Sequence, residues 1–280
     1  MADPLAVGIA LTTDPEKSRG MLEEFCRCLA NATGVKVTAH GMWHYHHLLE
    51  ALKAGEVDLV WLPPILALRA TARAGCIPIA LPVRHGVSSY STALFTRPDS
   101  EIVSIDDLRG VSAAWVDRQS AAGYLIIRAY LRSKGIDTEV AFTHEKFLGT
   151  HDAVAAAVIE GEVDVGATFA YLDPDAADGR PRKAGWGDAD VRMLCFAGPI
   201  PSDMIAANKR LAPETRDLVQ EALVDLADPE LARAARNLLG AEAFVAPDQS
   251  HLDSLLEILK NMEEMRGPAH TVFPPPSHKG

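Results

Sequence analysis

The sequence lacks several features that mark particular classes of protein. It has no apolar run near the roughly 18 to 20 residues that a membrane-spanning helix needs. It has no G-x-S-x-G, P-loop or H-E-x-x-H motif, so no catalytic apparatus is evident. Basic residues are outnumbered, 27 against 38 acidic ones, and the net charge of −11 argues against a nucleic-acid partner, which needs a basic face. A small anionic ligand is compatible with this charge, because such sites are local and use backbone N–H groups.

Cysteine is also scarce, with four residues in 280, and they do not form a disulfide framework. Cys26 and Cys28 are two apart on a predicted helix and point about 200° apart, so they cannot share a metal ion. We expect all four to be reduced and mostly packed.

The N-terminus has no basic segment and leads directly into a strand-like stretch, so no secretory signal is predicted. The sequence as given therefore indicates the cytoplasm, or the periplasm if it is a trimmed mature form.

Strand-like and helical segments alternate along the chain. Strands are predicted at 5–11, 35–39 and 57–62, with helical periodicity over 18–33 and 45–54. The pattern begins again after residue 100, with further strands and with helices predicted over 121–134, 151–160, 213–227, 229–239 and 251–265. The polar, turn-rich segment 173–190 is predicted to be a surface excursion, and the Pro-rich tail to be loosely held.

This alternation predicts two α/β units, each a parallel sheet covered on both faces. The expected lobes are 1–94 with 198–280, and 95–197. Small ligands bind such folds at the carboxyl ends of strands, so a cleft between the lobes is the expected binding place.

Five segments, in order, resemble motifs of one family, the phosphate/phosphite/phosphonate substrate-binding proteins of ABC transporters. They are "GEVDLVWLPPILALRA" (55–70), "SSYSTALFTRPDSEIVSIDDLRG" (88–110), "DRQSAAGYL" (117–125), "GTHDAVAAAVIEGEVDVGA" (149–167) and "GPIPSDMIAANKRLAPETRDLVQEAL" (198–223). The resemblance implies a type 2 periplasmic-binding-protein fold, in which two α/β lobes close on a small anionic ligand. It further implies an ABC permease or a sensor protein as the partner.

The segment "DRQSAAGYL" is the leading candidate for the anion site. A helix beginning after Ser120 would offer unsatisfied N–H donors and a partial positive charge. The amides of Ala121, Ala122 and Gly123 and the Ser120 hydroxyl are then candidate ligand contacts. The plain alternative is that Ser120 only caps the helix. Family members carry Ser or Thr at the positions of Ala121 and Ala122, so this chain lacks two hydroxyl donors. A less charged oxyanion such as a carboxylate is therefore a candidate ligand beside a phosphonate- or phosphate-like one.

The resemblance also implies roles for His151, which begins the next helix, and for Tyr90 and Tyr45, whose rings would line the cleft. Topology alone adds strand-end residues as candidates to hold the other end of the ligand, namely Thr12, Thr13, Trp61 and Pro64. For His151 the alternative is a capping or surface histidine, and for Tyr45 a packing role.

Four histidines crowd the segment "HGMWHYHH", namely His40, His44, His46 and His47. The His44 and His47 spacing suits a metal on a helix, but no nearby Cys or carboxylate completes a set. Solvated or partly packed histidines are therefore preferred, with metal binding as the minor alternative, and no metal or cofactor is predicted. Asp117 and Asp164 are expected near the cleft, as caps or turn formers rather than as an acid/base pair.

A cytosolic enzyme acting on a small carboxylate is the competing hypothesis, because chorismate dehydratase-like proteins are built on the same fold. Fold alone does not choose between binding and catalysis. The order of the motifs favours a binding protein.

Overall fold

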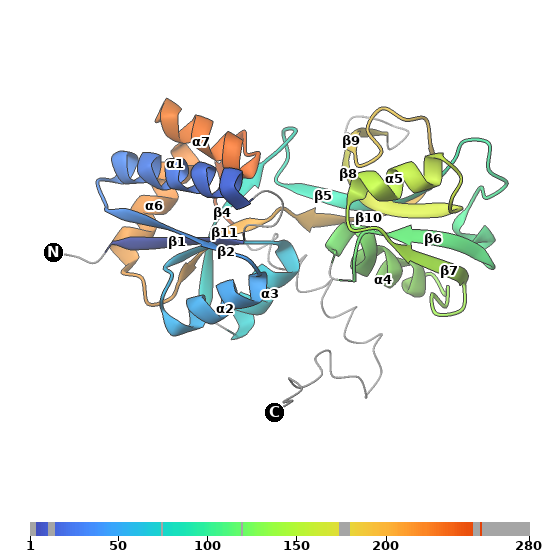
Figure 1. Cartoon of the computed structure of the whole chain (residues 1–280), viewed down its shortest axis with the longest axis horizontal. Coiled ribbons are helices and arrows are strands. Elements are labelled where there is room, and N and C mark those ends of the chain that lie inside the picture. Colours follow the sequence, from blue (N-terminus) through green and yellow to red (C-terminus); the bar gives the residue numbers. More distant parts are fainter. Residues whose placement is uncertain are drawn as a thin grey trace. The chain divides into compact units, whose positions relative to one another are not determined.

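The computed structural model describes residues 4–10, 15–73, 75–118, 120–173, 180–248 and 253. They form two compact α/β units, each built on its own sheet (Figure 1). Of the described residues, the first unit contains those up to Ser91, those of the segments 170–173 and 180–184, and those from Gly198 to Asp253. The second contains Thr92–Phe169 and Gly185–Ala197. The described residues 170–173 and 180–184, which lie within the lobe expected at 95–197, therefore belong to the first unit.

The first unit contains a mixed six-stranded sheet in the order β12-β4-β11-β3-β1-β2. Its strands are β1 (Leu5–Ala10), β2 (Val37–Met42), β3 (Leu59–Leu62), β4 (Cys76–Val83), β11 (Met204–Asn208) and β12 (Ala243–Val245). Strands β2 and β3 run parallel to β1, as the alternating pattern predicts. Strand β11 is antiparallel to β3 and β4, and β12 is antiparallel to β4, so the prediction of an all-parallel sheet is wrong here. Both strands are short and rich in alanine, which gives a weak strand signal in sequence.

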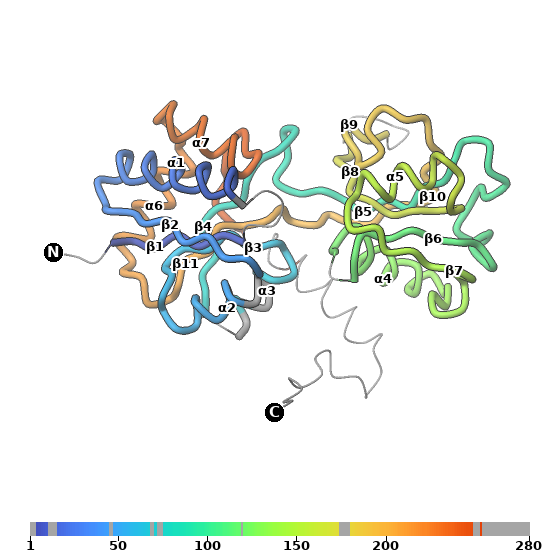
Figure 2. The backbone as a smooth tube through the Cα atoms, in the orientation of Figure 1, coloured from blue at the N-terminus to red at the C-terminus, as the bar shows by residue number. Residues whose placement is uncertain are grey.

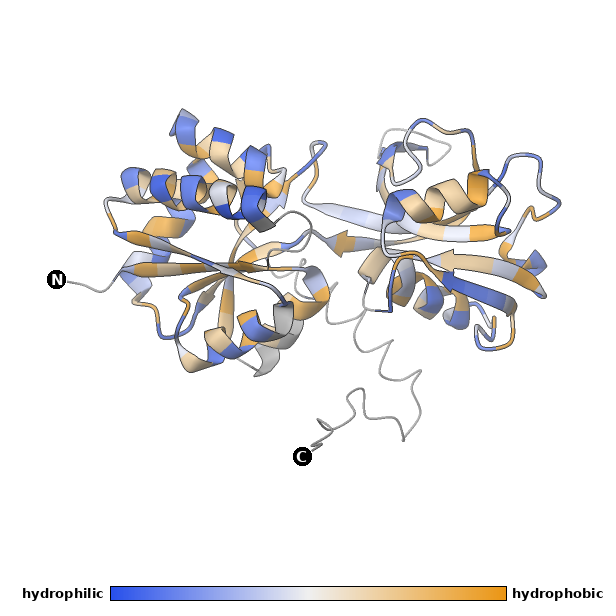
Figure 3. Ribbon diagram, in the orientation of Figure 1, coloured by the Kyte–Doolittle hydropathy of each residue, from blue (hydrophilic) through white to orange (hydrophobic). Residues whose placement is uncertain are grey.

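Five helices cover the two faces of this sheet. They are α1 (Pro15–Thr33), α2 (Tyr45–Ala54), α3 (Pro64–Arg73), α6 (Pro213–Asp225) and α7 (Pro229–Leu239). Helices α1, α6 and α7 lie on one face, and α2 and α3 lie on the other (Figure 1). Figure 3 shows hydrophobic residues along the central strands and hydrophilic ones along α1 and α7. The predicted helix over 251–265, and the tail beyond it, fall outside the described residues apart from Asp253.

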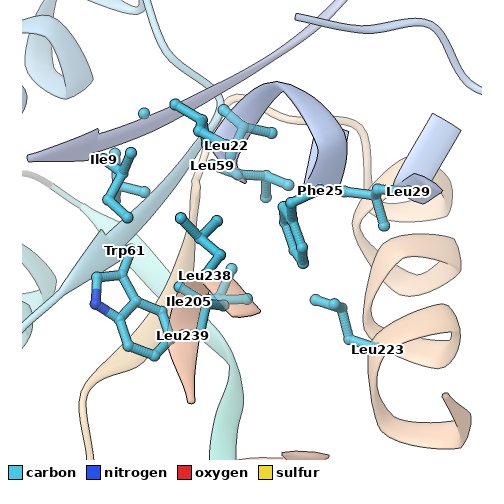
Figure 4. Close-up of a pocket in the computed structure, with 13 residues that line it drawn as sticks. Ile9, Leu22, Phe25, Leu29, Leu59, Trp61, Ile205, Leu223, Leu238 and Leu239 are labelled. Carbon is cyan, nitrogen blue, oxygen red and sulfur yellow. The ribbon is translucent and has the colours of Figure 1, made fainter. Parts of the chain in front are cut away.

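A small cavity of about 20 Å³ lies in the core of the first unit (Figure 4). Its lining is apolar and includes Phe25, Leu29 and Leu223 from the helices and the indole of Trp61 from β3. A space of this size holds about one water molecule, which needs two or more polar partners to stay there. The cavity is therefore a packing defect of the core and not a ligand site.

The sheet of the second unit has the order β10-β5-β8-β6-β7, and β9 pairs with β8. The strands are β5 (Ser89–Thr96), β6 (Val111–Trp115), β7 (Phe142–Phe147), β8 (Val165–Leu172), β9 (Pro181–Ala184) and β10 (Arg192–Pro201). Strands β7 and β8 are parallel to β6, whereas β9 is antiparallel to β8. Strands β5, β8 and β10 contain residues of both units. Helices α4 (Ile126–Ser133) and α5 (His151–Ile159) lie on opposite faces of the sheet (Figure 2).

Two predictions for the segments around this sheet need correction. The segment 173–190 is more than a surface excursion, because Pro181–Ala184 forms strand β9 and Trp186 is buried with its ring 4.8 Å from that of Phe95. Its polar composition hides both features, since they depend on partners outside the segment. The helix predicted over 121–134 begins as a π-helical turn, Ala121–Leu125, and continues as α4.

Each unit uses the motif G-E-V-D in the same way. The carboxylate of Asp58 accepts a hydrogen bond of 2.8 Å from the N–H of Ala6, at the start of β1. The carboxylate of Asp164 accepts one of 2.7 Å from the N–H of Ser112, at the start of β6. In both units the aspartate N–H also donates to the carbonyl of the residue it binds, at 2.8 and 3.2 Å. Asp164 thus lies at the amino end of β6, opposite to the expected ligand edge.

Candidate functional site

The turn after β6 carries the first group of candidate residues. Ser120 has extended backbone angles and is the N-cap of the π-helical turn. Its Oγ accepts a hydrogen bond of 3.0 Å from the N–H of Gly123. Capping of this helix is therefore a real role of Ser120, and the hydroxyl proton is left to donate elsewhere.

The structure limits which amides of this turn can reach a ligand. The N–H of Gly123 is already bonded to Ser120, so its predicted part as a free donor is wrong. Ala122 is buried, and the buried Thr92 hydroxyl donates to its carbonyl. Ala121 is half-buried, and in the described part of the chain no group accepts from its N–H. With the Gly123 amide occupied and Ala122 buried, the Ser120 hydroxyl and the Ala121 amide are the more accessible donors of this turn.

The small residues of the turn have a packing cause. A Cβ atom on Gly123 would lie 2.3 Å from Cγ2 and 2.7 Å from Cβ of Val116, which no real contact permits. The backbone of Gly123 does not lie in the left-handed region, so close approach alone requires the glycine here.

His151 is the first residue of α5, whose N-cap is Thr150. The Thr150 hydroxyl accepts a hydrogen bond of 3.1 Å from the N–H of Ala153. The imidazole of His151 is half-buried, with Nδ1 2.7 Å from the hydroxyl of Thr168 and its ring edge-on to Phe169. Two helical segments, one after Ser120 and one after Thr150, thus begin at the same end of β6, and each offers the positive end of its dipole.

Val116 joins these two helix starts directly. Its N–H donates to the carbonyl of Gly123 at 3.3 Å, and its carbonyl accepts from the N–H of Gly149 at 2.8 Å. Because Val116 is buried, both turns are held against one rigid point. The structure therefore brings the Ser120 and His151 segments together within the second unit.

The pH dependence of stability tests the environment of His151. Burial lowers the pKa of His151 below its usual value of 6.5 and outweighs the opposing charges of Asp152 and Asp117. As the pH falls below 6.5, the unfolded chain takes up a proton that the folded chain resists, so stability decreases. We predict a steeper loss of unfolding free energy between pH 7 and pH 5 for the natural chain than for His151→Gln, measured by urea denaturation. Parallel curves would contradict this environment.

The candidates of the first unit follow strands that share one sheet edge. Because β1, β2 and β3 are parallel, their carboxyl ends meet at this edge. Tyr45 begins α2 after β2, but its side chain lies outside the described part. Pro64 begins α3 and is buried, so it serves as an N-terminal helix proline and presents no free surface. Thr12 and Thr13 lie outside the described residues.

Tyr90 and Trp61 belong to a polar and aromatic cluster of the first unit that also contains Arg84, Tyr171 and Asp203. The guanidinium of Arg84 forms an ion pair of 3.1 Å with Asp203 and stacks 5.6 Å from the indole of Trp61. The rings of Tyr90 and Tyr171 are 6.1 Å apart. Burial, together with the charge of Asp203, raises the pKa of Tyr90, so its hydroxyl stays protonated and able to donate. Arg84, Tyr171 and Asp203 were not predicted, because only packing shows their proximity.

The histidine-rich segment shows no metal site in the part that the structure describes. The rings of His44 and His47 meet edge to face at 5.6 Å. Among the described residues no group of three or more His, Cys, Asp or Glu side chains is placed to hold a metal ion. The side chain of His46 lies outside that part.

No helix among the described residues is long and apolar enough to cross a membrane. The free cysteines Cys26, Cys28 and Cys76 are buried, and burial raises the pKa of Cys26 to about 12. Such thiols are packing residues with low reactivity.

The architecture of each unit defines the class of the protein. Solved structures with the same fold include XAC2383 from Xanthomonas citri bound to a chloride ion, with a TM-score of 0.74 and 21% identity over 94% of this chain and 98% of that one. PhnD1 from Prochlorococcus marinus, in complex with methylphosphonate, has a TM-score of 0.67 and 15% identity over 93% and 98% of the two chains. The fold is that of the periplasmic substrate-binding proteins of ABC transporters.

The family follows from the sequence of the whole chain. Residues 7–252 match the family "ABC transporter, phosphonate, periplasmic substrate-binding protein", and the chain belongs to it. The phosphonates-binding periplasmic protein of Escherichia coli (strain K12) is 24% identical over 268 residues, which are 94% of this chain and 78% of that protein. The phosphate-import protein PhnD of Mycolicibacterium smegmatis is 27% identical over 203 residues, or 68% and 62% of the two chains. The chain is thus a substrate-binding protein of this family, as the five motifs predict.

Proposed function

We propose that the chain binds a small oxyanion, phosphonate- or phosphate-like or a carboxylate, and delivers it to an ABC permease in the periplasm. The observation that carries this proposal is the convergence of two helix starts on Val116, with the Ser120 hydroxyl, the Ala121 amide and His151 around them. These are uncharged donors and helix dipoles, which suit an oxyanion without requiring a basic protein.

Tyr90, Trp61 and the Arg84–Asp203 pair are proposed as a second ligand-binding surface, which belongs to the first unit alone. Their rings give an apolar body with polar tips, which suits a short organic substituent. The family membership supports binding and transport, and we therefore place the enzymatic alternative second.

Ligand-induced thermal stabilisation tests this proposal. Methylphosphonate, phosphate, phosphite, sulfate and acetate are screened, and a true ligand at a hundred times its Kd stabilises the fold by about 2.7 kcal/mol. We predict that Ser120→Asp abolishes this stabilisation, because a carboxylate repels the anion. The variant should still fold, since aspartate is as good an N-cap as serine.

Ser100→Asp is the matched control, because it adds the same charge within the same unit. The Ser100 hydroxyl likewise accepts a backbone hydrogen bond, from the N–H of Ile102 at 3.1 Å, but Ser100 precedes β6 instead of following it. This control should retain the full stabilisation by the same ligand. Stabilisation that survives Ser120→Asp would remove this site, and conversion of the ligand, seen by mass spectrometry, would favour the enzyme.

A further inference from the structure

A threonine that was not predicted lies directly behind His151. Thr168, on β8, is fully buried, and its Oγ1 is 2.7 Å from Nδ1 of His151. The two residues come from different elements of the second unit, and their contact fixes the plane of the imidazole together with the edge-on ring of Phe169.

The hydrogen-bond balance of this pair sets the position of a proton. A threonine hydroxyl has one hydrogen to donate. Within the described part of the chain, the Thr168 hydroxyl forms its side-chain hydrogen bond with Nδ1 of His151. If Nδ1 carried the proton, the buried hydroxyl hydrogen would have no acceptor, which is unfavourable. Thr168 therefore donates, Nδ1 accepts, and the proton of the neutral imidazole lies on Nε2.

Gly185 makes room for this arrangement. A Cβ atom at residue 185 would lie 1.9 Å from Oγ1 of Thr168, so any other residue would displace the hydroxyl. The backbone at this point is fixed as well, because the N–H of Gly185 donates to the carbonyl of Phe169 at 3.1 Å.

We propose that Thr168 is a positioning residue, which holds His151 as a neutral imidazole with Nε2–H as the donor to the oxyanion. This inference rests on the proposed function, since it names how one contact of that site is oriented. Burial of His151, which lowers its pKa, favours the same neutral form. A neutral donor leaves recognition to hydrogen-bond geometry instead of charge.

Two variants of the full chain separate this role from simple packing. Thr168→Val keeps the shape and removes the hydroxyl, whereas Thr168→Ser keeps the hydroxyl. The tautomer of His151 is read without ligand from nitrogen–proton correlation NMR spectra, with His151→Gln to assign the signals. Affinity for methylphosphonate is measured by titration calorimetry.

We expect the Nε2–H tautomer in the natural chain and in Thr168→Ser, with affinities within about twofold of each other. Thr168→Val should lose this tautomer preference and bind about tenfold more weakly, the size of one hydrogen bond. An Nδ1–H tautomer in the natural chain, or an unchanged tautomer in Thr168→Val, would overturn the inference. The His151 tautomer, measured without ligand, tests the role of Thr168. Absence of any methylphosphonate binding by the natural chain counts against the proposed ligand. A failure of the Thr168 inference is therefore distinguishable from a failure of the proposed function.

Discussion

Replacing Arg128 by alanine is expected to lower the free energy of unfolding by about 3 kcal/mol, the largest single effect that we predict. The guanidinium of Arg128 is buried and donates to the carboxylates of Glu145 and Glu139 and to the carbonyl of Thr138. It also lies 5.1 Å from the ring centre of Tyr124. Its removal leaves the buried carbonyl of Thr138 without this donor and leaves Glu145 with the indole N–H of Trp115 but no positive charge beside it. This loss exceeds that of a surface pair because water does not replace the guanidinium fully.

The expected loss of stability lies at the lower end of the range for buried pairs because the side chain of Glu145 is 29% exposed and that of Glu139 is 68% exposed. The free energy of unfolding of Arg128→Lys should lie between those of the natural chain and Arg128→Ala, because an ammonium keeps the charge but cannot make the forked contacts of a guanidinium. Lys146→Ala, which breaks the exposed pair with Glu162, is the control and should cost less than about 1 kcal/mol. Chemical denaturation measures all three, and equal losses for Arg128→Ala and Lys146→Ala would contradict the buried network.

The second large effect concerns Gly123. Gly123→Ala should destabilise the protein by about 2 to 3 kcal/mol, because the new Cβ overlaps two atoms of Val116, and rotation of the valine relieves only one overlap. The same substitution crowds Ser120 Oγ, at 2.9 Å, so the affinity for an oxyanion should fall as well. Thermal denaturation and titration calorimetry with methylphosphonate measure the two effects.

Gly20→Ala provides the control for Gly123→Ala. Gly20 lies within α1, and nothing is within 4 Å of a Cβ placed there. Alanine should therefore stabilise the protein at this position by about 0.5 to 1 kcal/mol. In the background of Val116→Ala, Gly123→Ala should cost less than in the natural chain, because one of the overlapping atoms is gone. If Gly123→Ala changes the stability as Gly20→Ala does, the close contact with Val116 is not the reason for a glycine at residue 123.

Sequence pattern predicts most of this fold because its helices and buried strands are local features. The periodicity over 45–54 matches α2, and the apolar run at 57–62 contains β3. Strands β11 and β12 escape prediction because they are short and receive their hydrogen bonds from β4, far away in sequence. Strand β9 escapes because the polar residues around it resemble a loop.

In the candidate site too, local features could be predicted and contacts between distant residues could not. Ser120 and His151 could be named from motifs, since both begin helices. The occupation of the Gly123 amide by Ser120 could not, because it depends on the rotamer of one side chain. Thr168 and Arg84 were missed because their partners, His151 and Asp203, are 17 and 119 positions away.

The paired aspartates of the two G-E-V-D motifs have a consequence for how the molecule tolerates change. Each unit fixes the start of one strand of its own sheet with its own carboxylate, β1 through Asp58 and β6 through Asp164. Each of these two hydrogen bonds joins residues of the same unit. Substitutions that retune specificity in one half therefore leave the strand alignment of the other intact, which allows selectivity to diversify without loss of the scaffold.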